Sequence, residues 1–140
     1  MSRFLPRTLI AACAAAFIVL LPLSAAALSP AGTQTAESQG ALTPDQAMAL
    51  LKEGNDRFVS GKMMDRDLQA QVKATAGGQY PHSVVLACID SRVPPEVVFD
   101  QGIGDIFAPR IAGNFVDGEL LGSMEFAAAV AGSKLIVVLG

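Results

Sequence analysis

The pattern of apolar and polar positions after residue 42 predicts alternating strands and helices. Short, continuously apolar runs rich in β-branched residues predict buried strands, whereas apolar positions at helical spacing predict helices. The expected strands cover residues 83–87, 105–111 and 135–139, and the expected helices cover 44–59, 68–76, 94–100 and 117–131. This alternation is typical of an α/β fold, with a central parallel sheet flanked by helices and the 44–59 helix as an N-terminal arm.

Two of these helices carry clear start signals. Thr43-Pro44-Asp45-Gln46 matches a capping box with proline at the first helical position, and Asp117 is placed to cap the 117–131 helix. The apolar stripe of the second helix predicts core packing for Leu120, Leu121, Met124, Ala127 and Ala128.

The N-terminal 41 residues differ in composition from the rest of the chain. Residues 1–27 combine Arg3 and Arg7, an apolar run over 9–21 and a tail of small residues, which predicts a cleaved secretory signal peptide. An uncleaved membrane anchor is the alternative, because a run of this length is marginally able to span a bilayer. Residues 28–41 are rich in Ser, Thr, Gln, Gly and Pro and predict a flexible linker.

The sequence ends at Gly140, directly after the third predicted strand. A strand as apolar as 135–139 needs cover on both faces, and ligand sites in parallel sheets lie in the loops after the strands. We therefore expect residues 42–140 to be the N-terminal part of a truncated domain, the rest of which lies outside this sequence.

Charge and cysteine content narrow the choice of partners. Loss of Arg3 and Arg7 with the signal would change the net charge from −3 to −5, so nucleic acid is not an expected partner. The same cleavage removes Cys13 and leaves Cys88 as the only thiol, so no internal disulfide can form. A lone cysteine in an exported protein is expected to pair between chains or to have a chemical role.

Cys88-Ile89-Asp90-Ser91-Arg92 lies between a predicted strand and the helix that follows it. Alternation along this short loop places Cys88, Asp90 and Arg92 on one side, where Arg92 can fork onto the carboxylate of Asp90. The positive end of the following helix would stabilise both a thiolate and a carboxylate. The spacing alone fits a metal site, a nucleophile with an acid partner, or a small buried cysteine beside a surface ion pair. A cysteine phosphatase loop fits poorly, since it needs five residues between Cys and Arg.

Beyond this loop, the sequence resembles the β-class carbonic anhydrases over most of the chain after Gly40. The resemblance rests on Gln79-Tyr80-Pro81, Ala87 to Glu96, Asp100-Gln101-Gly102, Gly104 to Phe107, Arg110, Ala112-Gly113-Asn114 and Leu135 to Gly140. Pro109 departs from the family pattern before Arg110.

The resemblance implies one zinc ion per subunit, with Cys88 as the first ligand and Asp90 as an exchangeable one. A later His and Cys, in an H-x-x-C motif, are expected directly after Gly140. Asp90 either accepts a hydrogen bond from zinc-bound water or coordinates the metal as fourth ligand. Arg92 selects between these states by binding the carboxylate. His82 lies at the other end of the strand from Cys88 and is expected to be an ordinary surface or strand-edge residue.

The same resemblance implies a substrate site. Gln79 would point a donor toward the substrate oxygen, and Phe107 and Ala112 would line a small apolar pocket for carbon dioxide. Val85 and Ala87 stand where relatives regulated by bicarbonate carry Trp and Gly, which favours the ordinary type of active site.

We therefore expect a periplasmic, zinc-dependent enzyme that reversibly hydrates carbon dioxide to bicarbonate and a proton. It would act as a homodimer or higher homo-oligomer, with no stable membrane anchor after signal cleavage. Two alternatives remain open. One is a non-catalytic fragment or interaction protein that lacks a complete zinc site, and the other is a related hydrolase of carbon disulfide or carbonyl sulfide.

Overall fold

The protein forms a four-stranded parallel sheet with β1 (Ser83–Cys88) at its centre. The computed structural model describes residues 28–29 and 31–140, so the predicted signal segment 1–27 lies outside the described residues. On one side β1 pairs with β2 (Ile106–Phe107) and β3 (Arg110–Ile111), and on the other with β4 (Leu135–Leu139). No helix in the described ranges is long and apolar enough to cross a membrane.

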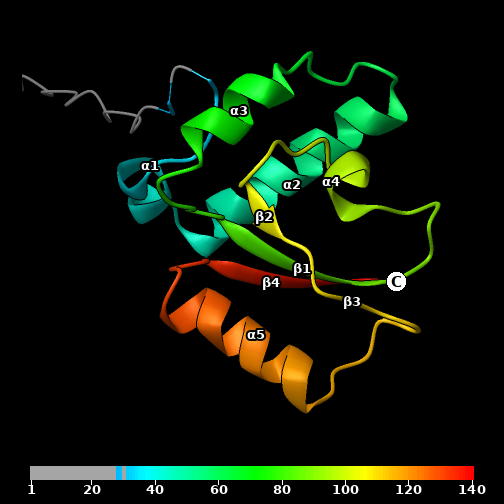
Figure 1. The fold of residues 1–140 in the computed structure, drawn as a ribbon. Helices are drawn as coiled ribbons and strands as arrows, with labels where there is room; N and C mark the ends of the chain where they lie inside the picture. The colour runs from blue at the N-terminus through cyan, green and yellow to red at the C-terminus, as the bar shows by residue number, and fades with distance from the viewer. Residues whose placement is uncertain (1–27, 30) are drawn as a thin grey trace, which may run out of the picture.

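Helices cover both faces of the sheet. α5 (Gly118–Ala129) lies against one face, below the sheet in Figure 1. The helices above the sheet are α1 (Ala36–Ala41), α2 (Pro44–Val59), α3 (Leu68–Ala74) and α4 (Pro95–Val98). The predicted α/β fold, a parallel sheet flanked by helices, is confirmed.

Alternate side chains of β1 enter two separate apolar clusters. Val84 and Leu86 point toward α5, where they pack with Met124 and Ala127. Val85 points the other way and packs with Leu51 of α2 and Ile106 of β2. Because both faces of β1 are buried, this strand fixes the position of the residues at its two ends.

The predicted arm helix forms over the expected residues. Thr43 and Gln46 make the expected reciprocal capping box at the start of α2. Ala47 and Leu51 are buried, so α2 lies along its own sheet rather than extending away from it.

The linker prediction for residues 28–41 is wrong where α1 forms. Thr35 and Ser38 build a second capping box, and Gln39 is buried. Its Nε2 donates to the carbonyl oxygens of Pro81 and Ala131, both at 2.8 Å. A polar side chain can be buried when its hydrogen bonds are made, and composition alone does not show those partners.

The predicted strand over 105–111 is two short strands, β2 and β3. Pro109 lies between them and has no N–H to donate to a ladder. Its carbonyl oxygen still accepts from the N–H of Ala87 at 3.1 Å, so the segment stays beside β1 through the break.

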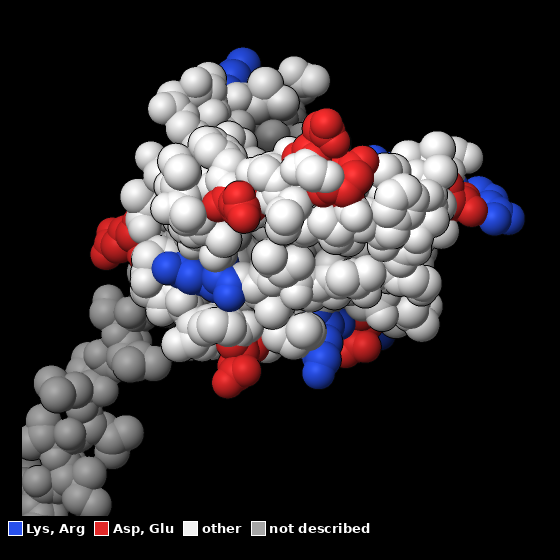
Figure 2. All heavy atoms as spheres, turned by 90° about the horizontal axis from the view of Figure 1, so that it is seen from below, with Lys and Arg blue, Asp and Glu red and all other residues white. Residues whose placement is uncertain are grey.

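The predicted apolar stripe of α5 is only partly buried. Met124 and Ala127 are in the core, whereas Leu121 and Ala128 are exposed. Ile136 and Val138 on one face of β4 are also exposed, at 47% and 60%. The face of the molecule seen in Figure 2, on the α5 side, shows only scattered charged side chains.

Candidate active site at the end of β1

The loop after β1 places Cys88, Asp90 and Arg92 together, as predicted. Asp90 Oδ1 accepts from the backbone N–H and from Nε of Arg92, each at 3.0 Å, and Oδ2 accepts from Nη2 at 2.7 Å. This is a fork-to-fork pair, which fixes the plane of the carboxylate. The hydrogen bonds from the Arg92 side chain and backbone lower the pKa of Asp90 to about 2. Asp90 is therefore a carboxylate at neutral pH.

Arg110 of β3 holds the backbone of the same loop. Its Nε donates to the carbonyl oxygen of Cys88 at 2.8 Å, and its Nη2 donates to that of Asp90 at 2.6 Å. The N–H of Ile89 also donates to the Ile111 carbonyl at 3.1 Å. The 88–92 loop is thus tied to β3 by a side chain and by the backbone.

Backbone N–H groups surround the thiol of Cys88, which forms no disulfide. The N–H of Gly113 donates to Sγ at 3.4 Å. This hydrogen bond, together with the N–H of Asp90, lowers the pKa of the Cys88 thiol below its ordinary value. The expected contribution of the helix after the loop stays a prediction, and α4 has four residues. The thiolate is favoured by N–H groups of the loop itself and of the segment after β3.

A small cavity of about 210 Å³ lies at this end of the sheet. Its lining residues come from the end of β1 and the following loop, from the segment after β3 and from the end of β4: Ala87, Cys88, Asp90, Val93, Asn114, Leu139 and Gly140. Nδ2 of Asn114 donates to the Leu139 carbonyl at 2.8 Å and so joins the end of β4 to the segment after β3. The cavity therefore brings the ends of three strands to the Cys88 thiol.

The structure does not bring the predicted substrate residues into this cavity. Gln79 is exposed and precedes β1, at the opposite end of the strand from Cys88. Phe107 pairs with Val84 in register and lines a separate apolar groove beside α5. Ala112 is exposed next to Gly113, so it lies near the thiol without lining the cavity. The roles of all three stay predictions.

The expectation that His82 is a surface or strand-edge residue is wrong in its burial. His82 is 1% exposed, and both ring nitrogens have partners. As expected, however, it precedes β1 and is at the opposite end of the strand from Cys88.

Arg110 and Asn114 are site residues to which the sequence assigned no role. Each acts on backbone carbonyls of a segment more than 19 positions away in sequence, a contact that spacing does not reveal. Gly113-Asn114 does give a local signal, since both residues have positive φ, 96° and 47°, and Gly-Asn pairs are common at such turns.

The described residues fit only part of a zinc site. Cys88 offers a soft ligand that is readily deprotonated, and Asp90 offers an oxygen that Arg92 already holds. No group of three or more His, Cys, Asp or Glu side chains that could hold a metal occurs within residues 28–29 and 31–140. A zinc site here needs further ligands.

Comparisons with known proteins identify the relatives of this chain. A family model described as carbonic anhydrase matches residues 83–140. Carbonic anhydrase 2 of Mycobacterium tuberculosis (strain H37Rv) is 47% identical over 98 residues, which cover 69% of this chain and 47% of that protein. The carbonic anhydrase of Mycolicibacterium smegmatis is 45% identical over 98 residues, covering 69% and 48%. This chain spans about half the length of these relatives.

Solved structures were also found to be similar. One is described as a crystal structure of tetrameric β-carbonic anhydrases from the filamentous ascomycete Sordaria macrospora, with 28% identity and a TM-score of 0.48 over 66% of this chain and 48% of that one. The family match covers β1 and the Cys88 loop through β4, where most of the sequence motifs lie. From the motifs and the curated relatives together, we conclude that this chain belongs to the β-class carbonic anhydrase family.

Proposed function

We propose that the protein to which this chain belongs reversibly hydrates carbon dioxide to bicarbonate and a proton. The observation that carries the proposal is the arrangement after β1, where a thiol with a lowered pKa stands beside a carboxylate locked by an arginine. The curated relatives are carbonic anhydrases at up to 47% identity, and β-carbonic anhydrases are zinc enzymes.

The residues of this chain would act mainly by holding and orienting groups. Arg92 fixes the carboxylate of Asp90, and Arg110 fixes the loop carbonyls on either side of it. Asp90, ionised across the neutral pH range, serves as a hydrogen-bond acceptor with a set direction. Phe107 and Ala112 would line the carbon dioxide pocket, and Gln79 would donate to the substrate oxygen. Because Gln79 lies at the opposite end of β1 from Cys88, its role requires that Gln79 of a second copy of the chain lie at the Cys88 site.

Zinc is part of the proposal although the described donors are too few to hold it. Cys88 would be one ligand, Asp90 an exchangeable one, and a His and a Cys following Gly140 would complete the set. When bound, zinc supplies the positive charge that activates water for attack on carbon dioxide.

The Cys88→Ser variant tests the proposal in the full-length gene product. We expect the wild-type protein to bind one zinc per subunit and to hydrate carbon dioxide. The variant should lose most of its zinc and most of its hydration activity, because a serine hydroxyl is a poor zinc ligand. Zinc content by atomic absorption and stopped-flow hydration at alkaline pH measure the two properties. Ser91→Ala is the matched control, and wild-type hydration without zinc would contradict the proposal.

The two alternative functions give different results in the same assays. A hydrolase of carbon disulfide or carbonyl sulfide would bind zinc but prefer those gases when the three are compared. A non-catalytic fragment or interaction protein is favoured by the incomplete donor set, and for the 140-residue chain it predicts neither stoichiometric zinc nor activity.

We also propose that the protein is a homodimer or a higher homo-oligomer. Leu121, Phe126 and Val130 of the α5 region are exposed apolar side chains, and a groove of about 720 Å³ lies between this helix and Phe107. A second copy would bury this surface. We expect Phe126→Lys to lower the molar mass measured by light scattering, whereas the exposed Glu125→Lys serves as the control. An unchanged mass for Phe126→Lys would exclude this surface as the interface.

Export to the periplasm rests on the sequence of residues 1–27 alone. We propose that this segment is a cleaved signal peptide, which leaves the protein without a stable membrane anchor.

A further inference from the structure

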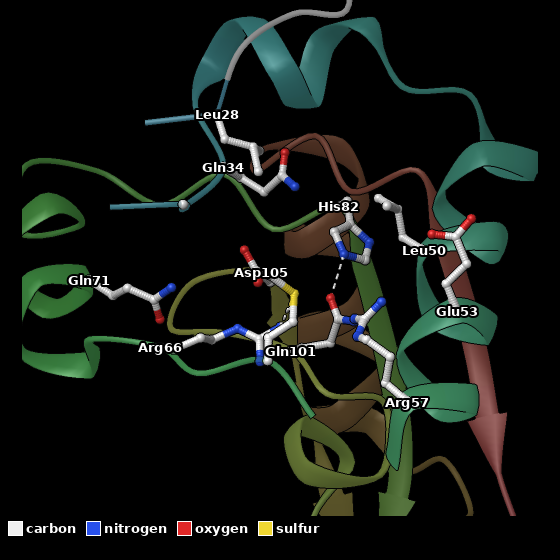
Figure 3. A pocket seen from close by; sticks show the side chains of 12 residues that line it. Leu28, Gln34, Leu50, Glu53, Arg57, Arg66, Gln71, His82, Gln101 and Asp105 are labelled. Carbon is white, nitrogen blue, oxygen red and sulfur yellow. Dashed lines mark hydrogen bonds between the residues drawn. The ribbon is translucent and has the colours of Figure 1, made fainter. Parts of the chain in front are cut away.

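A second cavity, of about 200 Å³, lies at the opposite end of β1 from Cys88. Figure 3 shows side chains from several elements converging on it, including Leu50 and Arg57 of α2, Arg66, His82, Gln101 and Asp105. The segment before α1 contributes Leu28 and Gln34. None of these residues lines the cavity at Cys88, so the two cavities are separate.

Asp105 carries the one buried side-chain oxygen or nitrogen within the described ranges that has no hydrogen-bond partner. The residue is 8% exposed and its Oδ2 accepts from the N–H of Gly102 at 2.7 Å. Its Oδ1 has no partner. Burying an oxygen without a hydrogen bond costs free energy, and a ligand that hydrogen-bonds to this atom would remove that cost.

His82 does not supply a positive charge to this cavity. Its Nε2 lies 3.0 Å from Oε1 of Gln101, and the amide nitrogen of Gln101 is bound to the Phe99 carbonyl. Nε2 therefore carries the hydrogen, and Nδ1 can accept from the Ser83 hydroxyl at 2.8 Å. Burial lowers the pKa of His82, more than the hydrogen bond with Gln101 raises it, so the ring is neutral at physiological pH.

Two arginines give the wall of the cavity an excess of positive charge. Arg57 and Arg66 both pair with the single buried carboxylate of Asp100. One guanidinium charge of this cluster is therefore not balanced by Asp100. Glu53 also lines the cavity, but it is exposed, so solvent screens its repulsion of an anion.

We propose that this cavity binds a short-chain monocarboxylate. The ligand carboxylate would accept hydrogen bonds from the guanidinium groups of Arg57 or Arg66 and from the protonated Oδ1 of Asp105. Its apolar tail would lie against Leu28 and Leu50. A volume of about 200 Å³ accommodates an acid of a few carbons. The site is distinct from the proposed catalytic loop and does not depend on its function.

Binding should take up a proton at Asp105. Burial raises the pKa of its carboxyl, and this effect exceeds the lowering effects of the Gly102 and Gln34 N–H groups, of Arg66 and, in its protonated form, of His82. Protonated Asp105 donates to a carboxylate, whereas ionised Asp105 repels it. Affinity should therefore fall by about tenfold for each pH unit above the pKa of Asp105 in the free protein.

Propionate and its neutral isostere propionamide are the probes. Titration calorimetry of the full chain at pH 6 should detect propionate and little or no propionamide, and propionate affinity should fall between pH 6 and pH 8. Leu50→Trp fills the apolar side of the cavity and should abolish binding without lowering the melting temperature. Equal affinity for the two probes, or no propionate binding at pH 6, would overturn the proposal.

Asp105→Asn separates a ligand role from a structural one. The asparagine oxygen can still accept from Gly102, and its amide places a permanent donor where Oδ1 stands. Propionate binding should therefore persist in this variant and become independent of pH. A folded variant that keeps the wild-type pH dependence would show that Asp105 is not the proton donor.

Discussion

Replacing Gly54 with alanine is expected to destabilise the fold by about 3 kcal/mol or more. Gly54 lies inside α2 and is buried. A Cβ built there would stand 1.7 Å from the carbonyl oxygen of Phe99 and 2.7 Å from its carbonyl carbon. Because these atoms are backbone, neither can rotate away, and α2 would have to move off the segment that follows α4.

Gly122→Ala is the matched control, because Gly122 also lies inside a helix, α5. No atom lies within 4 Å of the Cβ position there. Alanine is a better helix former than glycine, so this variant should be more stable than the wild type by up to about 1 kcal/mol. Urea unfolding followed by circular dichroism measures both. Similar effects in the two variants would show that α2 and the Phe99 segment are not in close contact.

Sequence periodicity predicted the elements of the fold well where local signals were strong. The capping box at Thr43 and the apolar runs at 83–87 and 135–139 mark α2, β1 and β4 closely, because the signal and the structure involve the same residues. α1 was missed because Gln39 is stabilised by Pro81 and Ala131, which are distant in sequence. The break between β2 and β3 follows from Pro109, whose effect depends on its place in the ladder.

The sequence likewise predicts the local contacts of the candidate site but not those between strands. The pairing of Asp90 with Arg92 is local, and alternation along the loop was enough to predict it. The contacts of Arg110 and Asn114 cross between strands, so they required the register of the sheet. The roles of Gln79 and Phe107 are implied by the family resemblance, and within one copy of the chain neither residue lines the cavity at Cys88.

Asp100→Asn is expected to destabilise the protein by about 3 kcal/mol at pH 7, because two arginines lose the charge that they surround. Asp100 is fully buried and accepts from Nε of Arg57 at 2.5 Å, from Arg66, and from the N–H of Met64 at 3.2 Å. Its φ is 45°, a value that asparagine tolerates as well as aspartate does. The substitution therefore removes charge and leaves the backbone preference nearly unchanged.

The pH dependence of the difference in unfolding free energy between the wild type and Asp100→Asn identifies the cause of the destabilisation. Burial raises the pKa of Asp100, but the hydrogen bonds from Arg57, Arg66 and Met64 outweigh it and hold this pKa below its ordinary value. A carboxyl with a depressed folded-state pKa stabilises the protein above its unfolded pKa of about 3.9, and this contribution is lost as the pH falls toward the folded value. The gap between the wild type and Asp100→Asn should thus narrow from pH 7 to pH 3.

Urea unfolding of both proteins at the two pH values measures that gap directly. The exposed Asp56→Asn is the control, and it should lie within about 0.5 kcal/mol of the wild type at pH 7. Asp100 joins Arg57 of α2 to the segment after α4, which itself follows the Cys88 loop. A gap that stayed constant with pH would assign the loss to packing and not to the ion pairs that hold these elements together.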